Sequence, residues 1–284
     1  MNQIARKPPT EAVSSAVMDS FRTHVQKTTG ISLQPSKAAM IHQRLRRRVI
    51  ECGFETTDDY LKHLMSSSGA KTEMVHAVDL ITTNTTSFFR EPQHFDFMTK
   101  TMLPELAARN GRRRVKVWSA AASEGAEAYT AAMIMAEAQR RGLSFDYAIL
   151  GTDISTRILE KAERAIFSAD QVAGIDPDLM ARYFMRSSDP QFAGMARIVP
   201  ELRRKVRFGS MNLMAKDYPI DRDINAVFLR NVLIYFDSED QRRVVDNVAK
   251  HIATGGYLFV GHSESMIVDN PSLKQVIPAV FQKV

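Results

Sequence analysis

Apolar residues recur at helical spacing near the start of the chain. One stripe runs from Val17 to Val25, and a second runs from Ala38 to Cys52, after Pro35. Two shorter stripes follow at 60–64 and 74–81, and nothing before residue 82 alternates as a strand would. The pattern predicts an all-α domain over residues 11–81. It also predicts a disordered lead over residues 1–10, where two adjacent prolines prevent a helix.

The pattern changes beyond residue 110. A β-branched run at 115–118 ends in the small residues 119–123, and an alanine-rich helical stretch follows Gly125. A second apolar run, at 145–150, leads to Gly151-Thr152-Asp153. Strand, small-residue turn, helix, strand and acid is the order of a mononucleotide-binding α/β unit. We therefore expect an α/β domain over residues 111–284, with a Rossmann-like, mostly parallel sheet.

The rest of the sequence predicts the other strands of this domain, a subdomain and a connecting helix. Apolar runs at 226–229 and 257–260 predict further strands of the main sheet, and residues 279–284 predict its closing edge strand. Short β-like runs at about 180–209, including 205–209, predict a small antiparallel β-subdomain inserted into the α/β domain. Residues 82–110 are expected to form a linker and a connecting helix, with Pro92 as the first residue of that helix.

The first turn of the α/β unit limits which class of nucleoside ligand can bind. It lacks the G-x-G-x-x-G pattern of dinucleotide folds, and Glu127 near the helix start would repel a pyrophosphate. A carboxylate there suits a ligand with a positive end, such as S-adenosylmethionine (AdoMet). Asp153, at the end of the second strand, would accept hydrogen bonds from the ribose hydroxyls. Asn212 and Leu213, at another strand end, would lie at the adenine edge.

Composition limits the setting. The single cysteine, Cys52, excludes an intrachain disulfide framework and a multi-cysteine metal cluster. No apolar run reaches transmembrane length and none resembles a signal peptide, so we expect a cytoplasmic protein with no membrane insertion. A net charge of +6 permits nucleic acid, an anionic lipid surface or an acidic protein as partner. Because aromatic residues are not interleaved with the basic ones, an acidic protein ranks above nucleic acid.

A basic face is expected on the second helix. Lys37, Arg44 and Arg48 share one side, with Arg47 a little further round, and Glu51 is the one acid within the helix. Such a run is usually a solvated face. An uncompensated cationic stripe is also a docking surface for an acidic helical partner, and the sequence leaves both interpretations open.

The segment 82–92 is dense in short hydrogen-bonding side chains and contains two adjacent phenylalanines. It is either a polar linker or the lining of a cleft. In the second case Arg90 would be a fixed cation for a carboxylate.

Five segments together resemble the chemotaxis receptor methyltransferase family (CheR), in one continuous order over about residues 15–284. They are Thr82-Thr83-Asn84-x-Thr86-x-Phe88-Phe89-Arg90-Glu91, Trp118-Ser119-Ala120, Gly151-Thr152-Asp153-Ile154, Arg230-Asn231-Val232-x-Ile234-Tyr235-Phe236 and Gly261-His262-Ser263-Glu264-Ser265.

The resemblance implies a cytoplasmic, AdoMet-dependent protein-glutamate O-methyltransferase that forms γ-glutamyl methyl esters on chemoreceptors. It implies an AdoMet site, with S-adenosylhomocysteine as product, at Asn84, Thr86, Arg90, Glu127, Asp153, Asn212, Leu213, Arg230 and Asn231. It also implies that the helical domain and its basic helix face the receptor's methylation region. The β-subdomain is similar to one that binds a receptor C-terminal tail peptide in some members.

One position departs from the family pattern. Ala121 stands where the family has a glycine, and a positive φ there would make the added methyl costly and lower the affinity for AdoMet. The departure motivates an alternative function, a non-catalytic regulatory module that binds AdoMet or its demethylated product.

Methyl transfer from a sulfonium to a carboxylate is an in-line displacement that needs no general base, because a glutamate is already ionised near neutral pH. The expected chemistry therefore needs no catalytic histidine and no metal. Arg90 is expected to orient a carboxylate. Tyr235 either shapes the path of the methyl group or is a core aromatic residue.

Overall fold

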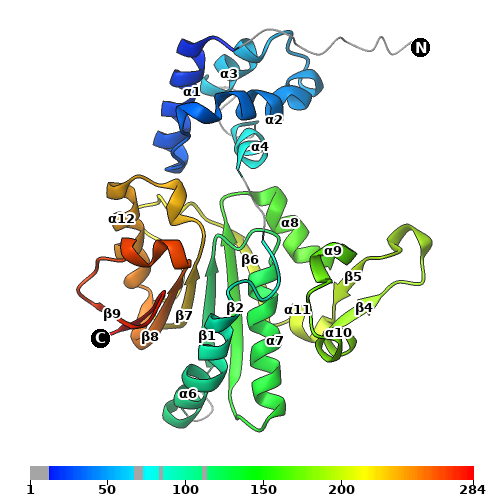
Figure 1. Cartoon of the computed structure of the whole chain (residues 1–284), viewed down its shortest axis with the longest axis vertical. Coiled ribbons are helices and arrows are strands. Elements are labelled where there is room, and N and C mark those ends of the chain that lie inside the picture. The colour runs from blue at the N-terminus through cyan, green and yellow to red at the C-terminus, as the bar shows by residue number, and fades with distance from the viewer. Residues whose placement is uncertain (1–12, 67–72, 83–85, 111–113) are drawn as a thin grey trace. The chain divides into compact units, whose positions relative to one another are not determined.

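The computed structural model describes residues 13–66, 73–82, 86–110 and 114–284. The chain forms two compact units (Figure 1). One comprises residues 1–84 together with 235–237, and the other comprises residues 85–234 and 238–284. No sequence pattern indicates that residues 235–237 return to the first unit. Among the described residues, no helix is both long enough and apolar enough to cross a membrane.

The first unit is helical, as the apolar periodicity predicts. Its helices are α1 (Ser15–Thr29), α2 (Ala38–Glu51), α3 (Thr57–Met65) and α4 (Glu73–Ile81), with a 3₁₀ turn at Pro35–Lys37. The Ser14 side chain caps the start of α1, and Gly30 ends it with a φ of 77°. The apolar stripes meet in one core that includes Phe21, Leu45 and Leu61, each with no exposed surface.

The second unit is built on a seven-stranded sheet. Its strands, in chain order, are β1 (Arg114–Ala120), β2 (Asp146–Asp153), β6 (Val206–Ser210), β7 (Ile224–Leu229), β8 (Ile252–Val260), β9 (Leu273–Ile277) and β10 (Val280–Lys283). The spatial order is β6-β2-β1-β7-β8-β10-β9. The five strands from β6 to β8 are parallel, and β10 is antiparallel to both its neighbours.

Helices connect these strands. The connecting helix is α5 (Pro92–Phe97), a π-helical turn (Met98–Met102) and α6 (Leu103–Asn110) in direct succession. It is followed by α7 (Ala126–Arg140), α8 (Thr156–Arg164), α11 (Pro200–Arg203) and α12 (Ser238–Ala249). Because β2 and β7 lie on opposite sides of β1, the strand order reverses at β1, and the carboxyl ends of β1 and β7 form the crevice where ligands of such sheets bind.

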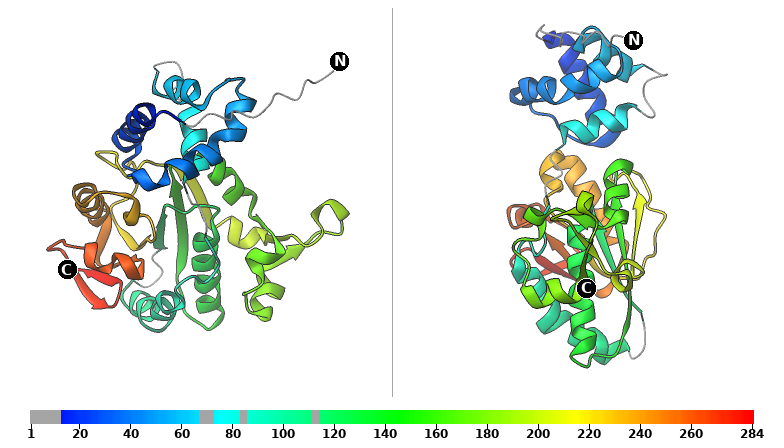
Figure 2. Two further views of the ribbon diagram at one scale, coloured as in Figure 1. Left: turned by 45° about the horizontal axis from the view of Figure 1, so that its top comes forward. Right: turned by 90° about the vertical axis from the view of Figure 1, so that its right-hand side faces the viewer.

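A small three-stranded sheet lies between α8 and β6 in the chain. Its strands are β3 (Ile166–Phe167), β4 (Phe184–Arg186) and β5 (Ala196–Ile198), in the order β3-β5-β4, and both pairings are antiparallel. It is accompanied by α9 (Ala169–Val172) and α10 (Pro177–Tyr183). Both Figure 1 and the left view of Figure 2 show this excursion projecting from the side of the α/β unit. The mainly parallel sheet and the antiparallel excursion agree with the predicted fold class.

Two strand assignments differ from the sequence expectation. The run at 205–209, expected in the excursion, is the main-sheet strand β6, paired in parallel with β2. Its side chain Phe208 packs against Gly151 of β2, where an added Cβ would lie 2.5 Å from the Phe208 ring. The excursion instead begins at β3, ahead of the range of about 180–209 in which the subdomain was expected. Alternation alone does not distinguish a parallel partner from an antiparallel one.

The closing strand also differs. Residues 280–283 form β10 inside the sheet, and the edge strand is β9. The middle of β9, Lys274 to Val276, is exposed, so this strand lacks the apolar alternation that would have revealed it.

Candidate cofactor site

The first turn, residues 121–125, joins β1 to α7 and lies against the end of β2. Three of its residues have left-handed backbones: Ala121 with φ 65°, Ser123 with φ 50° and Gly125 with φ 87°. The Ala122 amide donates to the Thr152 carbonyl at 2.8 Å, which fixes the turn to the neighbouring strand. Gly125 is required for space as well, because a Cβ there would lie 3.0 Å from both the Ala162 Cβ and the Phe208 ring. The turn therefore holds its backbone close to the strand ends.

Asp153 ends β2, and main-chain amides orient its carboxylate. The Ser123 amide donates to Oδ2 at 2.9 Å, and the Ser155 amide donates to Oδ1 at 3.0 Å. A carboxylate oxygen accepts more than one hydrogen bond. An acid held in this way at a strand end suits the two hydroxyls of a ribose.

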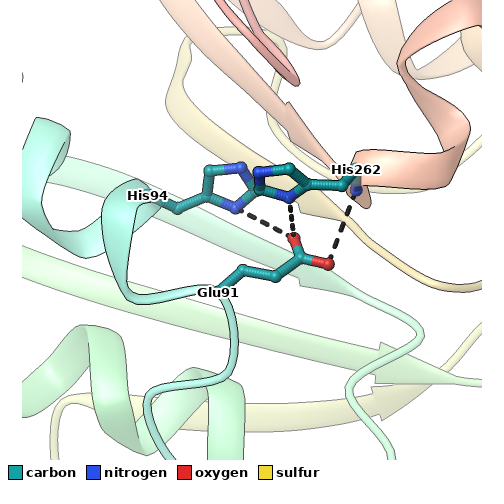
Figure 3. A group of neighbouring side chains, drawn as sticks. All are labelled: Glu91, His94 and His262. Atoms are coloured by element: carbon teal, nitrogen blue, oxygen red, sulfur yellow. Dashed lines mark hydrogen bonds and ion pairs between the residues drawn. The ribbon is translucent and has the colours of Figure 1, made fainter.

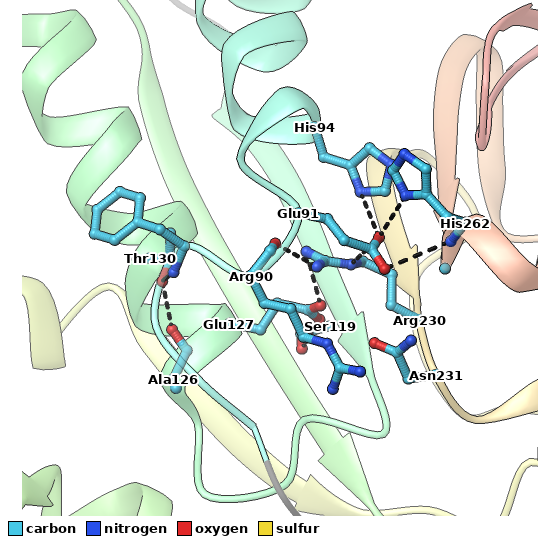
Figure 4. A network of polar contacts seen from close by, with 12 residues as sticks. Arg90, Glu91, His94, Ser119, Ala126, Glu127, Thr130, Arg230, Asn231 and His262 are labelled. Atoms are coloured by element: carbon cyan, nitrogen blue, oxygen red, sulfur yellow. Dashed lines mark hydrogen bonds and ion pairs between the residues drawn. The ribbon is translucent and has the colours of Figure 1, made fainter. Parts of the chain in front are cut away.

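A buried ion network lies beside the turn (Figure 4). Arg230 follows β7, and its side chain is 2% exposed; its Nη1 is 3.4 Å from Glu127 Oε2, and its Nε is 3.5 Å from Glu91 Oε2. Another nitrogen, Nη2, donates to the carbonyl of Arg90. Glu127 also accepts from the Ser119 hydroxyl at 2.6 Å. Arg230 thus joins the segment before α5, the first turn of α7 and the end of β7.

Burial and charge act in opposite directions on Glu127. Burial raises the pKa of its carboxyl, while Arg230 and the Ser119 hydroxyl lower it, and the net shift is upward. For Glu91, burial raises the pKa, but the charges of Arg230 and His94 outweigh it, and the net shift is downward. Glu91 is therefore ionised at neutral pH and balances the charge of Arg230.

Glu91, His94 and His262 form a cluster at the edge of this network (Figure 3). Nδ1 of each histidine is 3.4 Å from Glu91 Oε2, and the two rings stack with centroids 5.4 Å apart. Three such atoms could hold a metal ion. However, Arg230 Nε is 3.5 Å from Glu91 Oε2, so its positive charge would repel a dication bound at that oxygen. The cluster is better suited to orienting Arg230, and the expectation that no metal is used stays a prediction.

His94 is fully buried in this cluster. Burial lowers its pKa to about 4, and the Arg230 charge adds to the effect. The imidazole is therefore neutral at pH 7 and adds no charge next to Arg230.

The structure brings most of the predicted cofactor residues to one edge of the sheet. Asp153, Asn212, Leu213, Arg230 and Asn231 follow the carboxyl ends of β2, β6 and β7, and Glu127 lies in the first turn of α7. The Met211 amide donates to the Asp153 carbonyl at 2.9 Å, which places the segment containing Asn212 and Leu213 beside the acid. Asn212 Oδ1 accepts from the Met214 amide at 2.9 Å.

Residues of the polar segment 82–92 are placed in part. Asn84 lies outside the described residues, and Thr86 is half-buried just before Phe88. Arg90 has left-handed residues on both sides, Phe89 and Glu91, each with a φ of 54°. Its charge lowers the pKa of Glu127, so its side chain lies within electrostatic range of that acid.

Tyr235 belongs to the helical unit. Its carbonyl accepts from the Ser32 amide at 2.6 Å, and its half-buried ring packs against the helical core. A role near the path of the methyl group stays a prediction.

The basic face of α2 is partly neutralised within its own unit. Arg48 forms a two-point ion pair with Glu73, and Arg44 Nη1 donates to the carbonyls of Ile81 at 2.9 Å and Thr82 at 3.1 Å. Arg48 is therefore compensated by an acid of another helix, whereas Arg44 is held in place by carbonyl groups and keeps its charge. Lys37 is exposed, and the Arg47 side chain is 91% exposed despite an ion pair with Glu51.

Four site residues received no role in the sequence reasoning: Glu91, His94, His262 and Glu264. Three of them lie in the segments that carry the family resemblance, and that was the available signal. No catalytic histidine was expected, and the burial of His94 in an ion network has no counterpart in the local sequence pattern.

The fold and the site together define a class of protein. A mainly parallel sheet with an oriented acid at the end of β2, and a buried glutamate where a phosphate would sit, is a Rossmann-like unit for a nucleoside ligand with a cationic end. The family model described as "CheR methyltransferase, SAM binding domain" matches residues 84–281, and that for the "CheR methyltransferase, all-alpha domain" matches residues 16–82.

The chain therefore belongs to the CheR methyltransferase family. A chemotaxis protein methyltransferase of Borreliella burgdorferi is 32% identical over 91% of each chain. Chemotaxis protein methyltransferase 2 of Pseudomonas aeruginosa is 35% identical over 92% of this chain and 90% of its own. The Escherichia coli chemotaxis protein methyltransferase is 35% identical over 89% and 86%. These matches confirm the expected family and the expectation of a SAM-dependent methyltransferase.

Proposed function

We propose that this protein transfers a methyl group from AdoMet to glutamate side chains of chemoreceptors, in the cytoplasm, and forms γ-glutamyl methyl esters. The single observation that supports this most strongly is the match of both CheR family models over nearly the whole chain. The relatives named as chemotaxis protein methyltransferases support the same activity.

The residues at the strand ends fit AdoMet. Arg230 Nε and Nη1 are buried, and apart from their ion pairs of 3.5 Å with Glu91 and 3.4 Å with Glu127 they make no hydrogen bond among the described residues, which suits the carboxylate of an amino-acid moiety. Glu127 suits the cationic half of the ligand, and Asp153 suits its ribose. Asn84, Thr86, Arg90, Asn212, Leu213 and Asn231 complete the proposed cofactor site.

When bound, AdoMet supplies an electrophilic methyl group on a sulfonium. The protein's part is to position and desolvate the two charges, because water stabilises both of them before reaction. In this proposal Arg90 orients the substrate carboxylate and Tyr235 shapes the path of the methyl group. No proton needs to be removed from an ionised glutamate, so no residue acts as a general base.

The proposed receptor surface is the methylation region, with its acidic helical side facing Lys37 and Arg47. Arg44 and Arg48 were expected to share this contact, but their own ion pair and hydrogen bonds make them poorer candidates. A receptor tail peptide would bind at the excursion. There β4 is an edge strand, and a pocket of about 710 Å³ is lined largely by apolar residues, including Met180, Phe184 and Phe192.

A second candidate is a regulatory module that binds AdoMet or its product without turnover. The left-handed backbone at Ala121 favours it, because that position carries strain that a glycine would not have. One assay separates the two functions. Radiolabelled AdoMet is incubated with a receptor cytoplasmic fragment, and the label is tested for release by alkali. Alkali-labile label on the receptor supports the methyltransferase, whereas tight AdoMet binding without label supports the regulatory module.

A further inference from the structure

Glu264 is an acid with no exposed surface, and the function proposed above assigns it no role. It lies in the segment 261–265, which follows β8. Burial raises the pKa of its carboxyl, and hydrogen bonds from four main-chain amides oppose this rise. A buried acid costs stability unless its oxygens are satisfied, so its partners show what it does.

Those partners belong to two different loops. Oε2 accepts from the Asn231 amide at 2.7 Å and from the Gly261 amide at 2.8 Å. Oε1 accepts a longer bond from the Ile234 amide, at 3.4 Å. A carboxylate is a stronger acceptor than a carbonyl, so these bonds tie the loop after β7 to the loop after β8.

The loop after β7 has a left-handed backbone where Glu264 holds it. Asn231 has a φ of 58°, a conformation that asparagine tolerates, and the bond from its amide to Glu264 fixes it. The residue before it is Arg230, whose buried guanidinium joins Glu91 and Glu127. The hydrogen bond to the Asn231 amide therefore acts one residue away from the centre of the ion network.

Gly261 leaves room for this arrangement. A Cβ at this position would lie 2.7 Å from Glu264 Oε2 and 2.9 Å from Asn231 Nδ2. Its φ is −64°, a conformation that any residue adopts, so glycine is needed here for space and not for its backbone. The two loops and the carboxylate are packed too closely to admit a methyl group.

We propose that Glu264 is a positioning residue, which holds the loop containing Arg230 and Asn231 in the arrangement that binds AdoMet. This inference rests on the proposed function and names a further residue for the same site. Glu264 acts through the main chain of the loop.

The test is a calorimetric titration of the full-length protein with AdoMet and with S-adenosylhomocysteine. In Glu264→Gln, one carboxylate oxygen becomes an NH₂ group, which cannot accept from the loop amides. We expect the Kd for both ligands to rise by about tenfold or more, because a charged hydrogen bond to a buried amide is lost. Glu137→Gln is the matched control. Glu137 lies on α7 and accepts from Arg182 and Tyr183 at 2.7 Å each, outside the cofactor site.

Thermal unfolding without ligand distinguishes positioning from a structural role. Both variants should lose stability, but only Glu264→Gln should lose affinity; equal affinities in the two variants would overturn the proposal. If Glu264→Gln does not fold, Gly261→Ala decides, since it keeps the carboxylate and displaces it. Weaker binding by Gly261→Ala is expected, and wild-type affinity would overturn the proposal. A wild-type protein that binds neither ligand would instead overturn the proposed function.

Discussion

Arg48 Nε and Nη2 each lie 2.7 Å from a carboxylate oxygen of Glu73, which gives a two-point ion pair between α2 and α4. Tyr60 donates to the same carboxylate at 2.7 Å. Both charged side chains are less than one third exposed. The pair is therefore part of the structure of the helical unit. Arg47 carries exposed positive charge on the same helix.

Arg48→Ala should destabilise the helical unit by about 1–3 kcal/mol, because it leaves a mostly buried carboxylate without its cation. Arg47→Ala, on the same helix, should change stability by no more than about 0.5 kcal/mol, since its side chain is 91% exposed. Hydrogen exchange of peptides from α2 and α3, measured by mass spectrometry, would compare the two. Equal protection in both variants would contradict the structural role of Arg48.

The exposed cations Lys37 and Arg47 are the ones expected to contact the receptor. The double variant Lys37→Glu/Arg47→Glu should slow receptor methylation, most strongly at low salt, and leave AdoMet affinity unchanged. A matched control is Arg222→Glu/Lys274→Glu, which makes the same change in net charge at exposed positions of the α/β unit. If both pairs slow methylation equally, net charge is responsible and α2 is a solvated face.

Glu73 also predicts how the helical unit responds to acid. Its hydrogen bond to Arg48 outweighs burial and lowers its pKa from the usual 4.5 to about 2. A lowered carboxyl pKa contributes stability above the unfolded value, and that stability is lost as the pH falls through the window from 4.5 toward 2. Glu73→Gln should therefore be less stable at pH 7 and should lose less on acidification.

Hydrogen exchange of α2 and α3 peptides at several pH values would measure this effect. Asp146 provides an internal comparison in the α/β unit, because hydrogen bonds from Lys205 and Arg114 lower its pKa to about 2 as well. Asp146→Asn should flatten the acid response of α/β peptides only. A helical unit that loses protection with the same pH profile in wild type and Glu73→Gln would contradict the prediction.

The local pattern of apolar residues was sufficient to predict most of the helices and strands. It was not sufficient to predict which charged side chains of different elements pair with one another. The stripe of α2 is visible in Leu45 and Val49, and the parallel strands in their β-branched runs. The acid that neutralises Arg48 is 25 residues away in the sequence, on a different helix. A helix-by-helix count of charges therefore overestimated the free positive charge of α2.

In the candidate site, too, single residues could be predicted from the local sequence, but their pairing could not. Asp153 and Glu127 stand at places that the strand-turn-helix order marks as ligand-facing. The pairing of Arg230 with Glu91 joins the end of β7 to the segment before α5, and these residues are separated by more than a hundred positions in the sequence. Glu264 was visible only as one letter of a segment typical of the family, because main-chain amides as partners leave no trace in side-chain patterns.

Ala121, in the first turn, is expected to cost stability because of its left-handed backbone. Ala121 has a φ of 65° in the protein without ligand, so the cost of a left-handed alanine is already present before AdoMet binds. Ala121→Gly should raise the free energy of unfolding by about 0.5–1 kcal/mol, after subtracting the greater freedom of glycine in the unfolded chain. The Kd for AdoMet should change by less than about twofold, because the relief of backbone strain stabilises the free and the AdoMet-bound protein equally.

Urea unfolding and calorimetric titration would measure both quantities. Ala165→Gly is the control for backbone strain, because Ala165 has a φ of 54° at the end of α8. A gain in affinity of about tenfold or more in Ala121→Gly, without a gain in stability, would show that the methyl group obstructs the ligand. That result would show that the alanine lowers the affinity for AdoMet, as its positive φ predicts.

The two acids of the candidate site should hold opposite ends of the ligand, and substitutions can separate them. Asp153→Asn keeps an oxygen for the main-chain amides of the turn but removes the charge that accepts from the ribose hydroxyls. It should weaken AdoMet and adenosine alike, by about 1–3 kcal/mol. Glu127→Gln should weaken AdoMet by a similar amount and leave adenosine unchanged, because adenosine has no cationic half. Competition titrations with the two ligands would measure both effects. An Asp153→Asn protein that binds adenosine as the wild type does would show that the ribose lies elsewhere, and the placement of the cofactor along the strand ends would be wrong.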